Sequence, residues 1–188
     1  MRILIIDNYD SFVYNLVHVL YSLGEQDYHL VKNDQIDLDS VGTYDKILLS
    51  PGPGVPREAG LLCDLIQTFG PQKSILGVCL GHQAIGEVFG AKLHNLAGPL
   101  HGVQSLVRIA KSDYLFDTLP EEFEIGHYHS WVIDPDTLPP ELEVTSFDVD
   151  GHIMSIRHMH YDVRGVQFHP ESIMTPLGSQ IIANWLSK

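Results

Sequence analysis

The run from Ser74 to Gly86 constrains the fold most, because it combines a short apolar strand, a sharp turn and the start of a helix. Glycines stand two residues before and two residues after Cys79, at Gly77 and Gly81. Glycines at this spacing fit a strand-to-helix turn that is too crowded for Cβ atoms. The pattern therefore predicts a strand that belongs to a sheet, with Cys79 held clear of that sheet on the turn.

The N-terminal half repeats this alternation of strand and helix. Its apolar runs predict strands at 3–6, 28–31, 46–49 and 75–78, and helices at 11–23, 61–69 and 80–89. Ser11 is the expected cap of the first helix, and Gly24 is its expected end. The inward face of that helix is expected to carry Phe12, Leu16, Val19, Leu20 and Leu23. Such alternation predicts a parallel sheet with helices on both faces.

The C-terminal half has a different pattern, in which short strands follow one another at 103–109, 124–133, 142–147, 153–157 and 163–168. Thr175 and Pro176 are the expected cap and first residue of a closing helix. We therefore predict an α/β fold of three layers, with a mostly parallel central sheet of the flavodoxin or Rossmann type and antiparallel strands added by the C-terminal half. With 188 residues, the chain is expected to form a single domain, 1–188.

Cys79 is a candidate nucleophile. The start of a helix favours an anion through the helix dipole, and the thiolate is the nucleophilic form of cysteine. The alternative is a structural cysteine in a buried strand, which does not need the flanking glycines. For Cys63, which lies in an apolar helical stretch, that structural interpretation is the better one.

His169 and Glu171 are the candidate partners of this nucleophile. They follow the predicted strand 163–168, and the ends of parallel strands gather at the edge of a sheet where such turns also lie. His169 could take the thiol proton and later give it to a leaving amine, while Glu171 orients the imidazole. The sequence thus predicts a triad of Cys79, His169 and Glu171.

The Pro-Gly loop 51–54 follows the predicted strand 46–49 and leaves the amides of Gly52 and Gly54 unhindered. Such a loop can aim backbone N–H groups at a developing oxyanion, together with the amide of Leu80, which follows the nucleophile. Taken alone, a Pro-Gly cluster is also what an ordinary surface turn contains.

Together these segments resemble the class I, triad-type glutamine amidotransferases along the whole chain. Segment 77–83 is similar to the family's nucleophile motif, 167–172 to its His-Glu motif and 51–54 to its oxyanion loop. Segment 7–12 (Asp-Asn-Tyr-Asp-Ser-Phe) is similar to the opening of the subunits that serve anthranilate synthase and aminodeoxychorismate synthase. The motifs do not distinguish these two synthases.

The resemblance implies that Cys79 attacks the side-chain amide of L-glutamine to give a glutamyl thioester, with Gly54 and Leu80 in the oxyanion hole. It also implies the glutamine-binding residues, which are Gly52, Pro53, Gly54, Gln83, Ser130 and Trp131. Two residues depart from the family pattern: Trp131 stands where leucine is usual, and His127 where arginine often precedes the Tyr-His-Ser run. These departures could reshape the pocket wall or change partner contacts.

The resemblance further implies a partner, a chorismate-binding synthase subunit (component I) that receives the ammonia. That subunit is expected to dock over the Cys79 face, and the loop from Asn8 to Ser11 is the candidate for contact with it or for signalling between the two. No cofactor is expected in this chain, and Mg²⁺ is expected in the partner subunit. Tryptophan and folate biosynthesis are the two implied pathways.

Charge and composition exclude several other classes. The formal net charge of −13 disfavours a nucleic acid or an anionic membrane as partner. Two cysteines, and an apolar start too short for a signal peptide, favour a cytoplasmic protein. The histidine pairs 127/129 and 158/160 have the i, i+2 spacing of one strand face, but no carboxylate or cysteine stands at ligand spacing around them, so no metal site is expected.

Two alternatives remain open from the sequence. One is a stand-alone cysteine hydrolase of the same architecture, such as a peptidase or a γ-glutamyl hydrolase, which would need no partner. The other is a non-catalytic scaffold, whose usual mark is loss of the nucleophile, whereas Cys79, His169 and Glu171 are all present.

Overall fold

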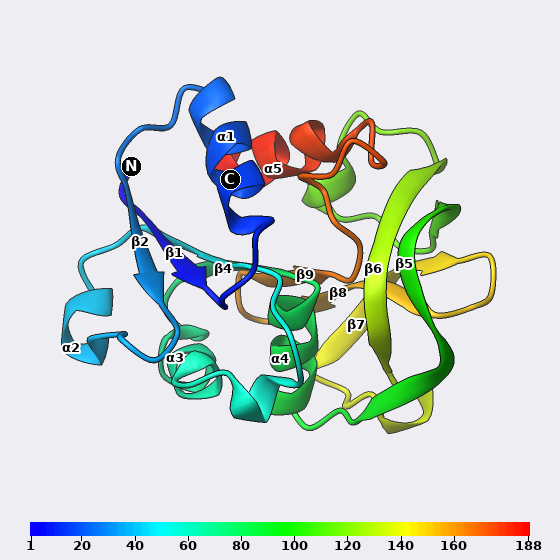
Figure 1. Ribbon diagram of the computed structural model, residues 1–188, viewed down its shortest axis with the longest axis horizontal. Helices are drawn as coiled ribbons and strands as arrows, with labels where there is room; N and C mark the ends of the chain where they lie inside the picture. Colours follow the sequence, from blue (N-terminus) through cyan, green and yellow to red (C-terminus); the bar gives the residue numbers. More distant parts are fainter.

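A mixed sheet of nine strands crosses the middle of the molecule, in the order β2-β1-β3-β4-β9-β8-β7-β5-β6. The computed structural model describes residues 1–188, and Figure 1 shows the sheet with helices above and below it. The strands are β1 (Ile3–Asp7), β2 (Tyr28–Lys32), β3 (Lys46–Leu49), β4 (Ser74–Val78), β5 (Leu93–Ile109), β6 (Glu122–Ile133), β7 (Leu142–Asp148), β8 (Ile153–His158) and β9 (Val163–Val166). The first five strands of the order, β2 to β9, run parallel, and the other four are antiparallel.

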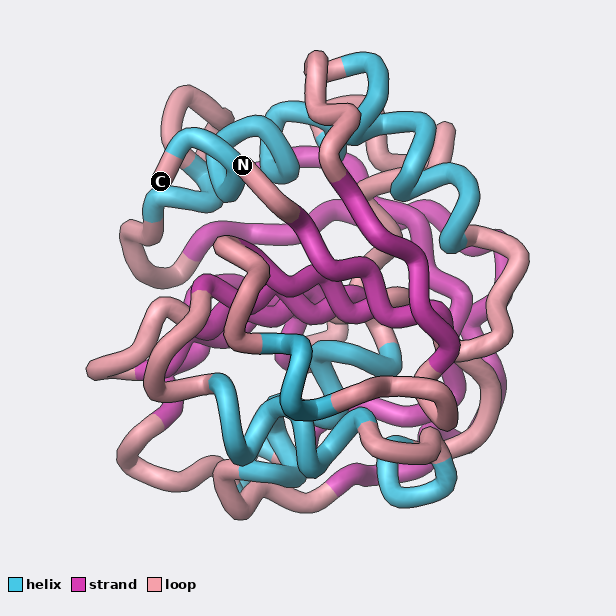
Figure 2. The backbone as a smooth tube through the Cα atoms, turned by 90° about the vertical axis from the view of Figure 1, so that its left-hand side faces the viewer, coloured by secondary structure: helices cyan, strands magenta, loops and turns pink.

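Helices cover both faces of the sheet, so the molecule has three layers (Figure 2). The helices are α1 (Val13–Ser22), α2 (Leu38–Val41), α3 (Leu62–Phe69), α4 (Leu80–Val88) and α5 (Gly178–Ser187). Short 3₁₀ turns lie at Pro56–Glu58, Tyr114–Phe116 and Pro135–Thr137. Helices α1 and α5 lie on one face and α3 and α4 on the other, which confirms the predicted α/β class with antiparallel strands at one side. None of the helices combines the length and apolar character needed to cross a membrane.

The inner parallel strands β1, β3 and β4 are buried on both faces, as their continuous apolar sequences require, whereas the edge strand β2 is partly exposed. Every residue of β1 and β3 is buried. Two apolar cores result, one on each side of the sheet: Ile6, Leu49 and Ile85 belong to the core under α3 and α4, and Ile5 and Trp185 to the core under α1 and α5. The sheet therefore holds the strand ends rigidly where the site residues follow.

Helix α1 begins later than predicted, and Ser11 does not cap it. The carboxylate of Asp10 accepts the backbone N–H of Phe12 at 2.7 Å, which ends the preceding loop, and the helix starts at Val13. Its buried residues are Val13, Leu16 and Leu20. Phe12 is half-buried and Leu23 is exposed. The prediction that Leu23 lies on the inward face of the helix is therefore wrong.

Helix α5 also begins later than predicted, at Gly178 rather than after Thr175. The hydroxyl of Thr175 is engaged elsewhere, because it accepts the backbone N–H of Gly126 at 3.0 Å and donates to the carbonyl of His169 at 2.7 Å. Thr175 therefore ties the segment after β9 to strand β6 instead of capping a helix.

Candidate active site

Cys79 lies at the turn between β4 and α4, in a conformation that L-residues rarely adopt: its φ is 52° and its ψ is −100°. A Cβ atom on Gly77 would lie 2.5 Å from the backbone of Gly81, and one on Gly81 would lie 2.7 Å from the backbone of Leu49. Only glycine fits at both positions, as the sequence predicts. The backbone N–H of Cys79 donates to the carbonyl of Val166 at 2.8 Å, so strand β9 also holds the turn.

His169 and Glu171 follow β9, the parallel neighbour of β4. The pairs Gly77–Gly165 and Val78–Val166 are opposite each other, so the two strands end at the same level. Nδ1 of His169 lies 2.7 Å from Oε1 of Glu171, and both side chains are buried. The predicted trio thus comes together at one edge of the sheet.

The Cys79 sulfur lies near enough to the imidazole of His169 to change its pKa. Burial by itself lowers the pKa of His169, but hydrogen bonding and charge from Cys79 and Glu171 outweigh it and raise the pKa to about 10. Nε2 of His169 is buried and makes no hydrogen bond of good geometry, which is common before a substrate binds. The imidazolium form of His169 is therefore favoured at this position.

The site is more enclosed than the turn alone predicts, since Cys79 is only 5% exposed. Two aromatic rings, those of Phe12 and Tyr128, pack over His169 with centroid distances of 5.0 and 4.9 Å. They also contact each other at 4.8 Å. No sequence pattern predicts this cover, because Phe12 comes from the loop after β1 and Tyr128 from the far strand β6. Only the tertiary structure brings them together.

The Pro-Gly loop 51–54 lies against the start of α4, where the sequence places an oxyanion site. A Cβ on Gly52 would lie 2.5 Å from the Leu80 side chain and 2.6 Å from that of Asn8. Gly54 is exposed, with a φ of 73°. Gly52 therefore allows the close approach of this loop to Leu80.

Asn8 holds this loop in place. Its backbone N–H donates to the hydroxyl of Ser50 at 2.9 Å, its side-chain Nδ2 donates to the Ser50 carbonyl at 2.8 Å, and its Oδ1 accepts from Asn33 at 3.0 Å. Asn8 is only 2% exposed, so within the loop predicted for partner contact or signalling it has a structural position. Tyr9 and Ser11 of the same loop are exposed.

Of the other predicted glutamine-binding residues, Gln83 points toward β6 and donates to the carbonyl of Trp131 at 2.8 Å. Ser130 and Trp131 are half-buried on β6, and Pro53 is exposed on its loop. Gln83 also donates to Oε1 of Gln167, whose Nε2 lies 3.6 Å from the Cys79 sulfur. Gln167 is not among the residues predicted for the site. Its i, i+2 spacing to His169 on the strand exit could have indicated it.

Hydrogen bonds also connect a row of polar side chains on β5 and β6. Nε2 of His127 lies 2.6 Å from the Ser105 hydroxyl, and its Nδ1 lies 3.0 Å from Nε2 of His129. Burial, with a smaller contribution from neighbouring histidines, lowers the pKa of His129 to about 3, and burial lowers the pKa of fully buried His82 to about 3. These rings are neutral, and His127 and His129 bond to each other.

The other histidine pair does not share a strand face. Strand β8 ends at His158, whose Nδ1 accepts the backbone N–H of His160 and of Tyr161 in the turn that follows. The predicted common strand face of 158 and 160 is therefore wrong, because the chain turns between them.

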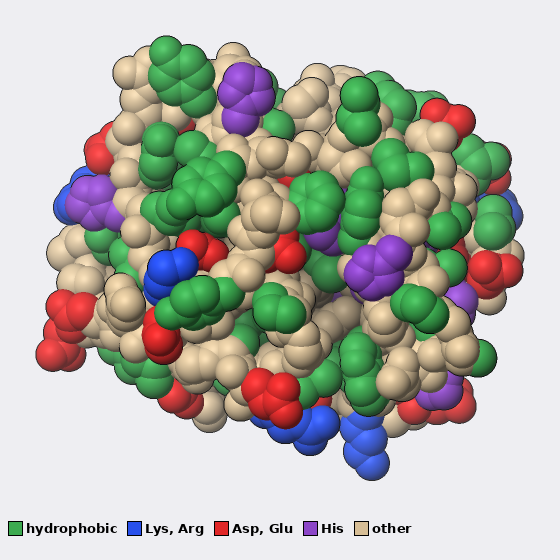
Figure 3. Space-filling model, in the orientation of Figure 1, with side chains coloured by type: hydrophobic (Ala, Val, Ile, Leu, Met, Phe, Trp, Pro, Cys, Tyr) green, Lys and Arg blue, Asp and Glu red, His purple; other side chains and the backbone are tan.

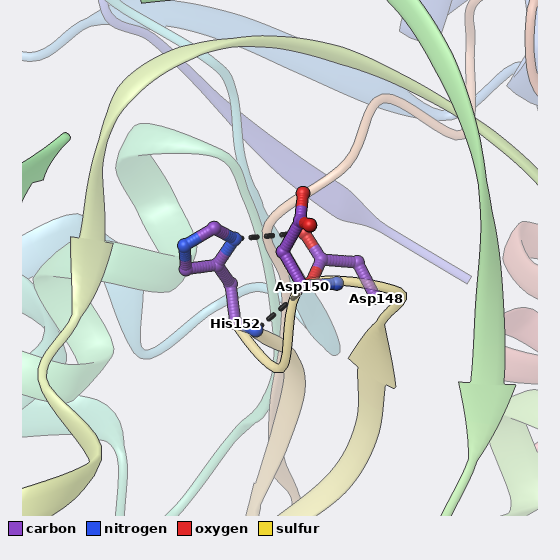
Figure 4. A group of neighbouring side chains, drawn as sticks. All are labelled: Asp148, Asp150 and His152. Carbon is purple, nitrogen blue, oxygen red and sulfur yellow. Dashed lines mark hydrogen bonds and ion pairs between the residues drawn. The ribbon is translucent and has the colours of Figure 1, made fainter. Parts of the chain in front are cut away.

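Asp148, Asp150 and His152 are the group of side chains shown in Figure 4. Oδ1 of Asp148 accepts the backbone N–H of both other residues, at 3.0 and 2.8 Å, and its Oδ2 lies 3.0 Å from Nδ1 of His152. These bonds close the turn between β7 and β8, and the turn explains why the three side chains lie together.

The surface around the site is uneven. The face seen in Figure 3 carries hydrophobic side chains on both sides of a narrow hollow. A cavity of about 720 Å³ borders Trp131, together with Arg57, Cys63 and Glu87, but includes none of the three candidate catalytic residues. Trp131 therefore lines this cavity and also accepts the hydrogen bond from Gln83 through its carbonyl.

Known proteins resemble this chain over nearly its whole length. The family model "Glutamine amidotransferase class-I" matches residues 4–188. Anthranilate synthase component 2 of Porphyra purpurea is 43% identical over 187 residues, which are 98% of each chain. Aminodeoxychorismate synthase component 2 of Escherichia coli is 42% identical over 188 residues, which are 99% of this chain and 100% of the relative.

Solved structures share the fold. A protein of Thermoplasma acidophilum, provisionally described as part of a GMP synthase, superposes with a TM-score of 0.88 at 26% identity over 100% of this chain and 92% of the other. A glutamine amidotransferase of Thermotoga maritima superposes with a TM-score of 0.77 at 16% identity, over 100% of this chain and 81% of the other. From its sequence and its relatives, this chain belongs to the class I glutamine amidotransferases.

Proposed function

We propose that this chain is the glutamine-hydrolysing subunit of a chorismate-converting synthase, and that Cys79, His169 and Glu171 perform the hydrolysis. The observation that carries the proposal is the strained turn that places Cys79 beside the His169–Glu171 pair, whose atoms lie 2.7 Å apart. The names of the relatives, components of anthranilate and aminodeoxychorismate synthases, support the pathway.

In the first half-reaction, the Cys79 thiolate attacks the side-chain amide carbon of L-glutamine, and the carbonyl oxygen becomes an oxyanion. The backbone N–H groups of Leu80 and Gly54 stabilise that charge; losing one such donor typically costs about 3–4 kcal/mol. His169 then gives its proton to the nitrogen as the C–N bond breaks. Ammonia leaves, and the glutamyl group stays on sulfur as a thioester.

In the second half-reaction, neutral His169 takes a proton from water, whose oxygen attacks the thioester carbon. The C–S bond breaks, glutamate is released and the sulfur returns to a thiolate beside the imidazolium. Glu171 orients the ring by accepting from Nδ1 in both steps. The side chain of Gln83, the backbone of 52–54 and the segment of Ser130 and Trp131 form the glutamine pocket.

The ammonia is used by another polypeptide, a chorismate-binding component I. Ammonia in bulk water is mostly ammonium near neutral pH and is then not a nucleophile, so direct transfer to an adjacent site preserves it. The exposed loop residues Tyr9 and Ser11, with Tyr14 at the start of α1, are the candidate contacts, since Tyr9 is 51% and Tyr14 is 65% exposed.

The test mixes the purified chain with each candidate component I, chorismate, Mg²⁺, and either glutamine or an ammonium salt. We expect glutamine-dependent formation of anthranilate or aminodeoxychorismate, and its loss in Cys79→Ser while the ammonium-dependent reaction continues. Glutamine-dependent product that persists in Cys79→Ser would contradict the roles assigned here. Peptide cleavage by the chain alone would instead favour a stand-alone hydrolase.

A further inference from the structure

Gln167 is buried directly beside the nucleophile. It is 0% exposed, and its side-chain Nε2 lies 3.6 Å from Sγ of Cys79. Its own backbone N–H donates to the carbonyl of Met154 at 2.8 Å, so the residue continues the pairing of β8 just past the end of β9. The side chain thus starts from a fixed backbone position two residues before His169.

A second contact determines which end of this amide faces the sulfur. Oε1 of Gln167 accepts from Nε2 of Gln83 at 3.1 Å, and the same Nε2 donates to the carbonyl of Trp131 at 2.8 Å. If the amide of Gln167 were flipped, two NH₂ groups would face each other, and an oxygen would face the sulfur. The Trp131 carbonyl therefore fixes Gln83, Gln83 fixes Gln167, and Gln167 presents an N–H to Cys79.

A thiolate at this position has little access to water, because Cys79 is 5% exposed. A buried anion needs hydrogen-bond donors in place of its hydration. His169 supplies one, but it gives up its proton when ammonia leaves and regains one when water attacks. A donor that never transfers its proton would keep stabilising negative charge on sulfur throughout.

We infer that Gln167 is a further catalytic residue of this site: its amide N–H donates to the Cys79 thiolate, and Gln83 holds it in the orientation that allows this. The contact between Gln167 and Cys79 does not depend on the proposed function, but its role during glutamine hydrolysis rests on that function. Gln167 transfers no proton and forms no bond. It stabilises the sulfur as the attacking anion and again as the leaving group when the thioester is hydrolysed.

The test measures the rate at which iodoacetamide alkylates Cys79 as a function of pH, because this small neutral reagent does not use the glutamine pocket. Gln167→Glu keeps the shape and the bond from Gln83 but turns an acceptor toward sulfur, whereas Gln167→Met removes the donor without adding charge. Gln72→Met is the matched control, since Gln72 is exposed in the turn after α3. Cys79→Ser in each background subtracts alkylation at Cys63.

We expect Gln167→Glu to slow alkylation at pH 7 about 10- to 100-fold and to move the profile to higher pH, because it loses a hydrogen bond to a charged atom and also adds a like charge beside the sulfur. Gln167→Met should shift the profile in the same direction by less, and Gln72→Met should match the wild type. In glutaminase assays with the partner, Gln167→Glu should lower kcat more than it raises KM.

Profiles of both Gln167 variants that coincide with the wild-type profile would overturn the inference. The outcome is separate from that of the proposed function. A shifted alkylation profile in a chain that proves to have no glutaminase activity would uphold the contact and refute the function. Normal alkylation with intact glutaminase activity would do the reverse. If Gln167→Glu fails to fold, Gln167→Met decides the question alone.

Discussion

The backbone at Cys79 predicts that the nucleophile lowers the stability of the fold. A non-glycine residue held in a sparsely populated φ/ψ region costs about 1–3 kcal/mol, and Cys79 has φ 52° and ψ −100°. Cys79→Ala and Cys79→Gly both remove the sulfur, but only glycine also releases the strain. Glycine adds about 0.5–1 kcal/mol of unfolded-state entropy relative to alanine. The difference leaves Cys79→Gly about 1 kcal/mol more stable than Cys79→Ala.

The assay is urea unfolding of both variants at pH 7, followed by circular dichroism. The matched control is Gln67→Ala against Gln67→Gly, because Gln67 is exposed in helix α3 and there glycine should be about 1 kcal/mol less stable than alanine. The sign of the alanine–glycine difference should therefore reverse between the two sites. If glycine is also the less stable residue at 79, the turn is not strained and the backbone at Cys79 does not lower the stability of the fold.

Three further predictions follow from buried contacts. Gly77→Ala should lower the free energy of unfolding in urea by about 3 kcal/mol, because the added Cβ would lie 2.5 Å from the backbone of α4. Gly42→Ala is the control, because an added Cβ there has no atom within 4 Å, and its free energy of unfolding should stay close to that of the wild type. Asn8→Ala should cost about 2–3 kcal/mol of stability and lower kcat, because it leaves the buried Ser50 carbonyl without its donor; an unchanged kcat would mean that this loop does not depend on Asn8. Below pH 6.5 the unfolded chain protonates His82 while the folded chain, with its pKa lowered by burial to about 3, does not, so stability falls as the pH falls. Between pH 7 and pH 5 the wild type should therefore lose about 2 kcal/mol more than His82→Leu, and parallel curves would refute this assignment.

The local turn and the strand-end residues were predictable because short-range rules determine them. Glycines at 77 and 81 signal a turn without room for Cβ atoms, and the structure shows a Cβ at either position within 2.7 Å of backbone. His169 and Glu171 could be placed near Cys79 because parallel neighbouring strands end at one level. The strand–helix pattern and the order of a doubly wound sheet are sufficient to predict both features.

The remaining features depend on contacts between distant segments, which no periodicity encodes. Asn8 looks like an exposed loop residue in the sequence, yet Ser50 and Asn33 bury it in hydrogen bonds. Thr175 has the local signature of a helix cap, yet its hydroxyl bonds to β6 and to the His169 carbonyl. In each case a tertiary partner competes successfully with the local preference of a side chain.

The antiparallel half explains why a site at a parallel-strand end is so enclosed. Strand β6 is the last strand of the sheet, four positions away from β9, yet the N–H of His169 donates to the carbonyl of Gly126 on β6 at 3.2 Å. A flat sheet could not make this bond. The pairing of β5 with β6 is interrupted twice, between Asn95 and Leu100 and again before Val103, and such bulges bend and twist a strand. The curvature, visible at β5 and β6 in Figure 1, brings Tyr128 over the imidazole and the Trp131 carbonyl to Gln83. The parallel strands thus position the reacting sulfur, and the bulged edge of the sheet encloses it.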